Sequence, residues 1–173
     1  MIRKASMNDL DRIEEIYNEI HTEIEEGRAR IGWYRNVYPA RDIAEDSIRR
    51  RDMFVMEVGG KVVAAGRINQ YQGPEYDRAT WSFDADPDDV MVLHTLVVSP
   101  KEKAKGYGEA FARFYEDYAR QQGCGTLRID TNAINAPARA LYKKLGYTEA
   151  CIVLTSFNGI DGVNLVCLDK KLN

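Results

Sequence analysis

A chain of 173 residues, of which 45% are hydrophobic and 29% charged, is long enough for one domain with a buried core, and we expect a single domain over residues 1–173. The net charge of −3 gives no support for a nucleic-acid partner, since domains that bind nucleic acid usually carry a basic excess, and no apolar run approaches the length of a membrane span. Three cysteines without CxxC spacing argue against a disulfide framework or zinc site, so we expect a cytoplasmic protein with no metal and no nucleic-acid or membrane partner.

The first third of the chain has the pattern of a strand, two helices and a hairpin. Ser6 and Asp9 have the spacing of a helix capping box, and the apolar stripe that follows repeats with a helical period. Gly59-Gly60 predicts a tight turn between two apolar runs. The predicted elements are a strand at Ile2–Ala5, a helix from the capping box to Gly27, a polar helix at Arg41–Arg51, and strands at Met53–Val58 and Lys61–Ile68.

The sequence leaves two alternative roles open for each of two irregular segments. The aromatic loop from Ile31 to Pro39 either packs over the edge of the core or forms the wall of a substrate pocket, in which case Trp33 and Tyr38 contact the substrate. The polar insertion between Gln70 and Asp89 is rich in aspartate. It is either a solvated acidic loop or a negative field that attracts a cationic amine.

The stretch from Met91 to Ala110 combines a strand, a turn and the start of a helix. A β-branched strand ends at Val98, a basic turn follows Pro100, and Gly106-Tyr107-Gly108 begins a helix. The first N–H groups of a helix have no partner inside it and lie at the positive end of the helix dipole, so this turn is suited to bind phosphate. The alternative is an ordinary strand-to-helix loop with surface lysines.

The last third predicts two more helices and three strands. A helix runs to Gly123, and a second is punctuated by Asn135 as its cap, Pro137 in its first turn and Gly146 after its end. The predicted strands are Thr126–Thr131, Ala150–Phe157 and Val163–Asp169, the last two joined by a hairpin turn over residues 158–162.

This order of elements and two motifs resemble the Gcn5-related N-acetyltransferase (GNAT) family over essentially the whole chain. The first motif is similar to the family's acetyl-CoA motif Gln/Arg-x-x-Gly-x-Gly/Ala and reads here Lys103-Ala104-Lys105-Gly106-Tyr107-Gly108, with lysine in the first position. The second motif is Asn-x-x-Ala-x-x-Leu-Tyr-x-x-Leu-Gly-Tyr, which residues Asn135 through Tyr147 match. The resemblance implies an α/β fold of the α+β type, the acyl-CoA N-acyltransferase fold. Its mixed sheet of about seven strands is flanked by about four helices. Strands Val90–Val98 and Thr126–Thr131 would separate to admit the cofactor.

The resemblance also implies which residues bind acetyl-CoA. Strand-end backbone groups and Asn135 would contact the pantetheine arm, the turn amides would hold the pyrophosphate, and Tyr142 would lie near the thioester sulfur. Asn135 acting only as a helix cap, and Tyr142 acting only as a packed aromatic, stay open as alternatives. The implied cofactor contacts are Leu96, Val97, Val98, Lys103, Ala104, Lys105, Gly106, Tyr107, Gly108, Glu109, Ala110, Asn135, Ala138 and Tyr142.

Acetyl transfer needs a neutral amine, a donor for the oxyanion and a proton for the leaving thiolate. We assign Tyr142 as the proton donor. His94 is the candidate base, because alternation along its strand puts it on the same side as Leu96 and Val98 unless a bulge intervenes. The alternative is a hydrogen-bonded histidine that supports the strand. Glu57 and Glu109 are weaker candidates.

The sequence therefore favours an N-acetyltransferase that transfers acetyl from acetyl-CoA, by direct attack in a ternary complex, to a primary amine of a small molecule or protein. The acidic insertion suggests a polyamine or a lysine-like acceptor, and the family makes a homodimer conceivable. The alternative is a non-catalytic acyl-CoA-binding module of the same fold. A dinucleotide oxidoreductase is disfavoured, because Phe111 stands where GxGxxG requires its third glycine.

Overall fold

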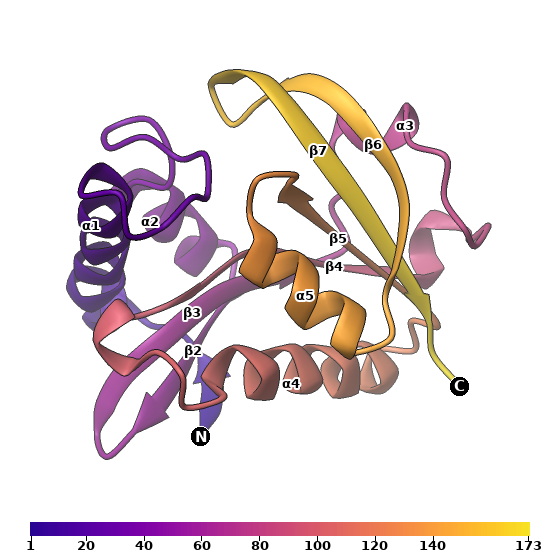
Figure 1. Cartoon of the computed structure of the whole chain (residues 1–173). Helices are drawn as coiled ribbons and strands as arrows, with labels where there is room; N and C mark the ends of the chain where they lie inside the picture. Colours follow the sequence, from indigo (N-terminus) through magenta and orange to yellow (C-terminus); the bar gives the residue numbers. More distant parts are fainter.

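The computed structural model describes residues 1–173 and contains one seven-stranded mixed sheet with helices on both faces (Figure 1). The strands lie in the order β1-β2-β3-β4-β5-β7-β6, and only β4 and β5 pair in parallel. The strands are β1 (Ile2–Lys4), β2 (Met53–Val58), β3 (Lys61–Asn69), β4 (Val90–Val98), β5 (Thr126–Asn132), β6 (Thr148–Phe157) and β7 (Ile160–Lys171). The helices are α1 (Leu10–Glu25), α2 (Arg41–Arg49), α3 (Pro74–Asp77), α4 (Tyr107–Gln121) and α5 (Ala136–Lys144).

The predicted order of strands and long helices is confirmed, and the acidic insertion adds the short helix α3. The capping box is also confirmed, since the Ser6 N–H donates to Asp9 at 2.8 Å. The last hairpin differs from the prediction. Its turn is Asn158-Gly159 alone, both with positive φ, and Phe157 pairs with Ile160. An Asn-Gly pair suits the tight turn whose twist matches the strands, so β6 and β7 extend further than predicted.

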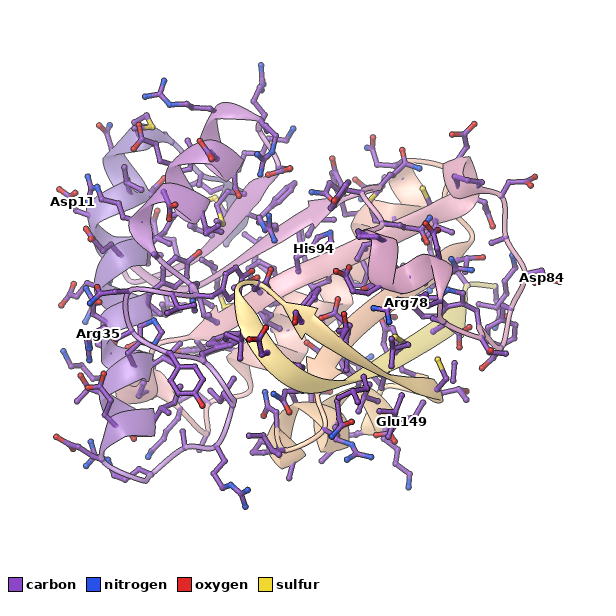
Figure 2. The ribbon with its side chains drawn as sticks, turned by 90° about the horizontal axis from the view of Figure 1, so that it is seen from above. Asp11, Arg35, Arg78, Asp84, His94 and Glu149 are labelled. Atoms are coloured by element: carbon purple, nitrogen blue, oxygen red, sulfur yellow. The ribbon has the colours of Figure 1, made fainter.

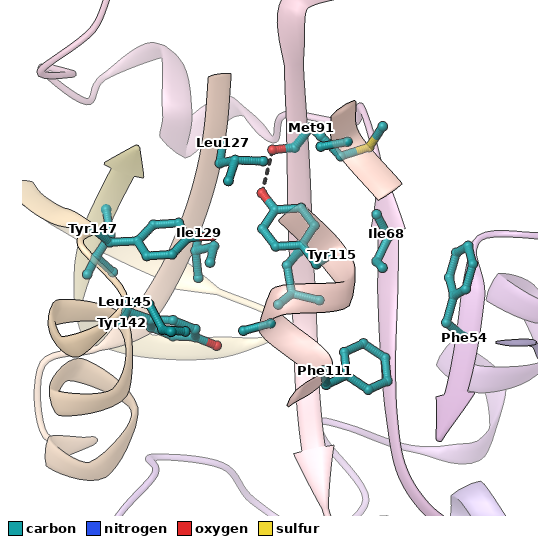
Figure 3. Packing of buried hydrophobic residues seen from close by; sticks show 14 of the residues in the cluster. Phe54, Ile68, Met91, Phe111, Tyr115, Leu127, Ile129, Tyr142, Leu145 and Tyr147 are labelled. Atoms are coloured by element: carbon teal, nitrogen blue, oxygen red, sulfur yellow. Dashed lines mark hydrogen bonds between the residues drawn. The ribbon is translucent and has the colours of Figure 1, made fainter. Parts of the chain in front are cut away.

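The two faces of the sheet carry separate apolar clusters. On one face α1 and α2 pack against β2 and β3, around Ile13, Ile16 and Tyr17. On the other face α4 and α5 pack against the central strands, around Phe111 and Tyr115 (Figure 3). Both faces of the sheet are therefore covered by helices.

The central strands β4 and β5 pair over only four residues each. Val90–Leu93 pair with Thr126–Ile129, and beyond this point β4 continues to Val98 without β5 beside it. The separation of these strands, which the family resemblance implied, is therefore present. The Tyr115 hydroxyl, from α4, donates to the Met91 carbonyl of β4 at 2.6 Å and lies 3.2 Å from the Arg128 carbonyl of β5 (Figure 3). It links the two strands just before they separate.

We expect Tyr115→Phe to destabilise the fold, because the change removes a fully buried donor from two strand carbonyls. Leaving a buried polar group unpaired costs about 1–3 kcal/mol, and each kcal/mol lowers Tm by about 2–4 °C in a domain of this size. Thermal unfolding measures the loss. The matched control is Tyr118→Phe on the same helix, where the half-buried ring stacks on Phe114. Equal Tm values for both variants would contradict the linking role.

The three cysteines are free thiols, as predicted. No three or more His, Cys, Asp or Glu side chains gather in a group that could hold a metal ion. None of the helices has both the length and the apolar character needed to cross a membrane.

Candidate active site

The turn before α4 presents a row of unpaired backbone N–H groups. From Lys103 to Glu109 no backbone N–H donates a hydrogen bond within the chain. Ala104 and Gly106 adopt positive φ angles of 63° and 78°, which turn the backbone into α4. The row thus coincides with the predicted phosphate-binding segment. Ala110 differs from the expectation, because its N–H already donates to the Gly106 carbonyl at 3.0 Å.

The lysines of this turn differ in whether a carboxylate of the chain already neutralises their charge. Lys105 forms an ion pair with Glu102 at 2.6 Å, and Lys101 forms one with Glu19 at 2.9 Å. Lys103 is exposed and has no carboxylate within ion-pair distance. The lysine that departs from the family motif is therefore the one available to an incoming anion.

The end of β4 offers free backbone groups toward the gap between the strands. The Ser99 N–H donates to the Val63 carbonyl of β3 at 2.8 Å, and Val97 pairs with Ala65. Alternate residues of an antiparallel strand direct their backbone N–H and C=O groups to opposite neighbours. The backbone groups of Leu96 and Val98 therefore point away from β3, toward the gap between β4 and β5. Of the three strand-end residues named from the family resemblance, Val97 is thus the one engaged with β3.

The second motif brings Asn135, Ala138 and Tyr142 to the wall of one pocket. The Asn135 side chain accepts a long hydrogen bond of 3.4 Å from the Ala138 N–H, so it caps α5 while lining the pocket. Tyr142 is 5% exposed, and burial, reinforced by the charge of Asp130, raises the pKa of its hydroxyl well above the ordinary value. Tyr142 is therefore protonated at every physiological pH and can act as a proton donor.

The pocket itself lies where β4 and β5 separate and encloses about 760 Å³, counting its open mouth. Its wall comes from the aromatic loop, β3, β4, β5, α5 and the last hairpin. The predicted site residues His94, Leu96, Asn135, Ala138, Tyr142, Trp33 and Tyr38 all line it.

His94 lies on the opposite face of β4 from Leu96 and Val98, contrary to the expectation from simple alternation. Ala65 of β3 pairs with Val97 of β4, and Arg67 pairs with His94, so two steps along β3 correspond to three along β4. The extra residue of β4 lies at Thr95, whose φ is +51°. This bulge reverses the alternation. Leu96 and Val98 therefore pack toward α4 and α5.

The environment of His94 keeps it neutral. Its Nε2 is 2.8 Å from the Asn69 side-chain oxygen, and burial together with the charge of Arg67 lowers the pKa of the imidazole to about 3. Because the Asn69 oxygen only accepts hydrogen bonds, Nε2 carries the proton. These contacts fit the alternative of a hydrogen-bonded histidine that supports the strand. Glu57 and Glu109, the weaker candidate bases, form ion pairs with Arg3 and with Lys144 and line no part of the pocket.

Asp130 is a pocket residue that the sequence reasoning missed. It follows Ile129, the last β5 residue paired with β4, and the Tyr76 hydroxyl donates to its carboxylate at 2.7 Å. Burial raises the pKa of Asp130 to about 6, while the Tyr76 hydrogen bond opposes the shift. A signal was present: Asp130 is an acidic residue near the end of an apolar strand, just before the second motif.

The aromatic loop lines the pocket and also packs over the edge of the core, because Ile31 and Trp33 contact the apolar cluster under α1 and α2. Trp33 and Tyr38 meet edge to face at 6.0 Å, and the Tyr38 hydroxyl contacts the Thr95 hydroxyl at the bulge. Gly32 has a φ of +84°, and a Cβ there would lie 2.3 Å from the Asn132 amide nitrogen. The loop therefore reaches across the gap to the end of β5, which favours the pocket-wall interpretation.

The aspartates of the acidic insertion lie away from this pocket, although Tyr76 of the same segment donates to the pocket residue Asp130. Asp84 is at the rim of the molecule while His94 is near its centre (Figure 2). Asp89 accepts hydrogen bonds from the Gly125 N–H and the Thr126 hydroxyl, at the paired end of β4 and β5. The aspartates of this insertion line no part of the pocket, so they supply little of the field that an amine would meet there.

Comparison with known proteins agrees with this arrangement. The family model described as "Acetyltransferase (GNAT) family" matches residues 10–147. A structure of a GNAT-family acetyltransferase from Streptococcus agalactiae superposes with a TM-score of 0.83 at 21% identity, covering 100% of this chain and 95% of that one. A Salmonella typhimurium structure that contains acetyl-CoA superposes with a TM-score of 0.72 at 21% identity, covering 100% and 94%.

Curated relatives match over shorter segments. The [Ribosomal protein bS18]-alanine N-acetyltransferase of Escherichia coli (strain K12) is 34% identical over 74 residues, which is 43% of this chain and 50% of that protein. Streptothricin acetyltransferase of Streptomyces lavendulae is 32% identical over 57 residues, 33% of this chain and 30% of that protein. The matched region thus spans about a third to a half of these relatives' length.

The mixed sheet, the split between its parallel strands and the amide row before α4 define an acyl-CoA N-acyltransferase fold. The family match covers most of the chain, and the chain belongs to the GNAT family of acetyltransferases. The resemblance identified from the two motifs is confirmed.

Proposed function

We propose that this protein transfers the acetyl group of acetyl-CoA to a primary amine of a small molecule or protein, by direct attack in a ternary complex. One arrangement carries the proposal. The unpaired amides from Lys103 to Glu109 lead past the free edge of β4 into a pocket that holds a partly buried carboxylate, Asp130, and a protonated tyrosine, Tyr142. A phosphate-bearing thioester and an amine could meet there from opposite ends.

The residues at the two ends have separate tasks. The amide row and Lys103 would bind the pyrophosphate, as unpaired N–H groups at a helix start do for anions. Leu96, Val98 and Asn135 would bind the pantetheine arm. Acetyl-CoA supplies the activated acyl group. Holding both reactants in one pocket makes the attack effectively unimolecular.

Asp130 is a better base than His94 in this pocket. Its pKa is about 6, against about 3 for His94, and this difference of about three units corresponds to about 4 kcal/mol in proton affinity. Asp130 would take a proton from the ammonium of the acceptor. The freed nitrogen then forms a bond to the carbonyl carbon and becomes positively charged. As the carbon–sulfur bond breaks, Tyr142 gives its proton to the departing thiolate, and the nitrogen loses its surplus proton to the Tyr142 oxygen, which leaves a neutral amide and restores the tyrosine hydroxyl.

The test combines binding and turnover. Acetyl-CoA at about 100 times Kd should stabilise the protein by about 2.7 kcal/mol, which raises Tm by several degrees. Thiol release is then measured across small amines, amino acids and peptides with free amino groups. A Tm rise with thiol release supports the enzyme. A Tm rise without thiol release from any acceptor would favour the non-catalytic acyl-CoA-binding module, and no Tm rise would refute both.

A further inference from the structure

The acceptor end of the pocket contains a positive charge that no residue of the chain neutralises. Arg67, on β3, lines the pocket, yet no carboxylate lies within ion-pair distance of its guanidinium. Its Nε is buried without a hydrogen-bond partner, and its one contact is a long one of 3.4 Å to the Tyr38 hydroxyl. A buried donor without a partner is rare in folded proteins and calls for an explanation.

Other arginines with limited exposure show how unusual this is. Arg3, Arg12, Arg35 and Arg139 each form an ion pair with a glutamate or aspartate. One nitrogen each of Arg12 and Arg128 is also buried without a partner, but Arg12 has its ion pair. Arg128 has no ion pair, but it stacks on Trp81 at 4.2 Å and donates to Gln72 and to the Phe83 carbonyl. Arg67 is the partly buried arginine that has neither an ion pair nor a stacking partner, and it faces the pocket.

Arg67 and Asp130 face the pocket from the two sides of His94. Arg67 pairs with His94 across β3 and β4, and Asp130 follows the paired residues of β5. Paired strands lie about 4.8 Å apart, and Asp130 lies just beyond the last pair of β4 and β5, so the two charged residues are roughly 10 Å or more apart at the backbone. They form no ion pair with each other, although the charge of Arg67 lowers the pKa of Asp130. The space between them has a positive and a negative end.

We propose that Arg67 binds the carboxylate of an acceptor that is a small amino acid, while Asp130 binds its ammonium group. This inference rests on the proposed function, because it names the substrate class of the same site. A planar guanidinium matches a carboxylate through two parallel N–H donors, and a neutral amine or a polyamine would leave Arg67 unpaired. The inference replaces the polyamine expected from the acidic insertion.

The experiment compares matched acceptors at saturating acetyl-CoA. Each amino acid is paired with its amide and with its decarboxylated amine, and thiol release gives kcat/KM. Hydrogen bonds to a charged group imply that the wild-type protein favours the acid by about 10- to 150-fold. Arg67→Met should lower kcat/KM for the acid to the level of its amide, and Arg67→Lys should recover part of the preference. Arg78→Met, which removes an exposed arginine bonded to Leu154 and Thr155, should keep the preference.

Calorimetric binding of the same ligands in the presence of CoA separates the two proposals. If no acceptor releases thiol but the amino acid binds and Arg67→Met abolishes that binding, the acetyltransferase proposal fails and the anion site stands. If thiol is released equally well from acids, amides and amines, the anion site is refuted and the acetyltransferase proposal stands. Binding of the amino acid to Arg67→Met with unchanged affinity would also overturn the role of Arg67, whatever the turnover.

Discussion

Replacing Asp130 with asparagine is expected to inactivate the protein and to stabilise it at the same time. Asparagine keeps an oxygen that can accept the Tyr76 hydrogen bond but cannot take a proton from the acceptor. Removal of a general base lowers rates by about 10²- to 10⁴-fold. In the wild-type protein kcat/KM should rise with pH through about 6, because the carboxylate is the active form. Thiol-release assays from pH 5 to pH 9 measure both effects.

The stability change of Asp130→Asn has a defined pH dependence. The folded pKa of about 6 lies above the ordinary value of 3.8, so the contribution of this carboxyl to stability is largest below pH 3.8 and falls as pH rises toward 6. The shift of about two units sets an upper limit of about 3 kcal/mol. Asp130→Asn should therefore raise the free energy of unfolding at pH 8 by up to this amount and change it little at pH 3. Three neighbours affect this carboxylate: Arg67 and Tyr76 lower its pKa and Glu75 raises it.

Two control variants distinguish the loss of the general base from the general effect of replacing a polar residue inside the fold. Asp169 is a buried carboxylate of β7 that accepts the Ser82 and Phe83 N–H groups at 2.7 and 3.0 Å. Asp169→Asn should lose stability, opposite in sign to Asp130→Asn. His94→Gln should keep the kinetic transition near pH 6, because the His94 pKa is about 3. If that transition disappears in His94→Gln and persists in Asp130→Asn, the assignment of the base is reversed.

The sequence predicted the helices and strands because their signals are local. The capping box at Ser6, the Gly59-Gly60 turn and the glycine at Gly106 each act through the backbone of a few neighbouring residues. The bulge at Thr95 has no such signal, since a threonine with a φ of +51° is held there by its surroundings. That one residue reverses the strand alternation, so the side of β4 expected for His94 without a bulge is not the side it occupies.

The acceptor end of the site depends on tertiary contacts that periodicity does not report. Asp130 has a raised pKa because Tyr76, from an insertion more than 50 positions earlier, covers it together with the sheet. Arg67 matters because a carboxylate partner is absent, and a sequence cannot show that absence. The cofactor end was predictable, because its donors are backbone groups whose positions follow from strand, glycine turn and helix.

Tyr142→Phe is expected to lower kcat by about 10²-fold, the lower end for loss of a general acid, with little change in the Tm shift caused by acetyl-CoA. The effect stays at the lower end because a thiolate with a pKa near 8.5 departs without full protonation. The matched control is Tyr147→Phe. Tyr147 packs edge to face on Tyr142, with ring centroids 5.7 Å apart (Figure 3). Tyr147 does not line the pocket, and its buried hydroxyl has no hydrogen-bond partner.

The pH dependence tests the role of the Tyr142 proton directly. Burial keeps the hydroxyl protonated well beyond pH 10, so wild-type turnover should not fall between pH 8 and pH 10 for want of this acid. In Tyr142→Phe only solvent acids can assist the departing thiolate, and their supply falls as pH rises through the thiol pKa of about 8.5. The deficit of the variant should therefore widen with rising pH. A deficit that is constant across this range would mean that Tyr142 only shapes the pocket, and unchanged turnover would remove it from the mechanism.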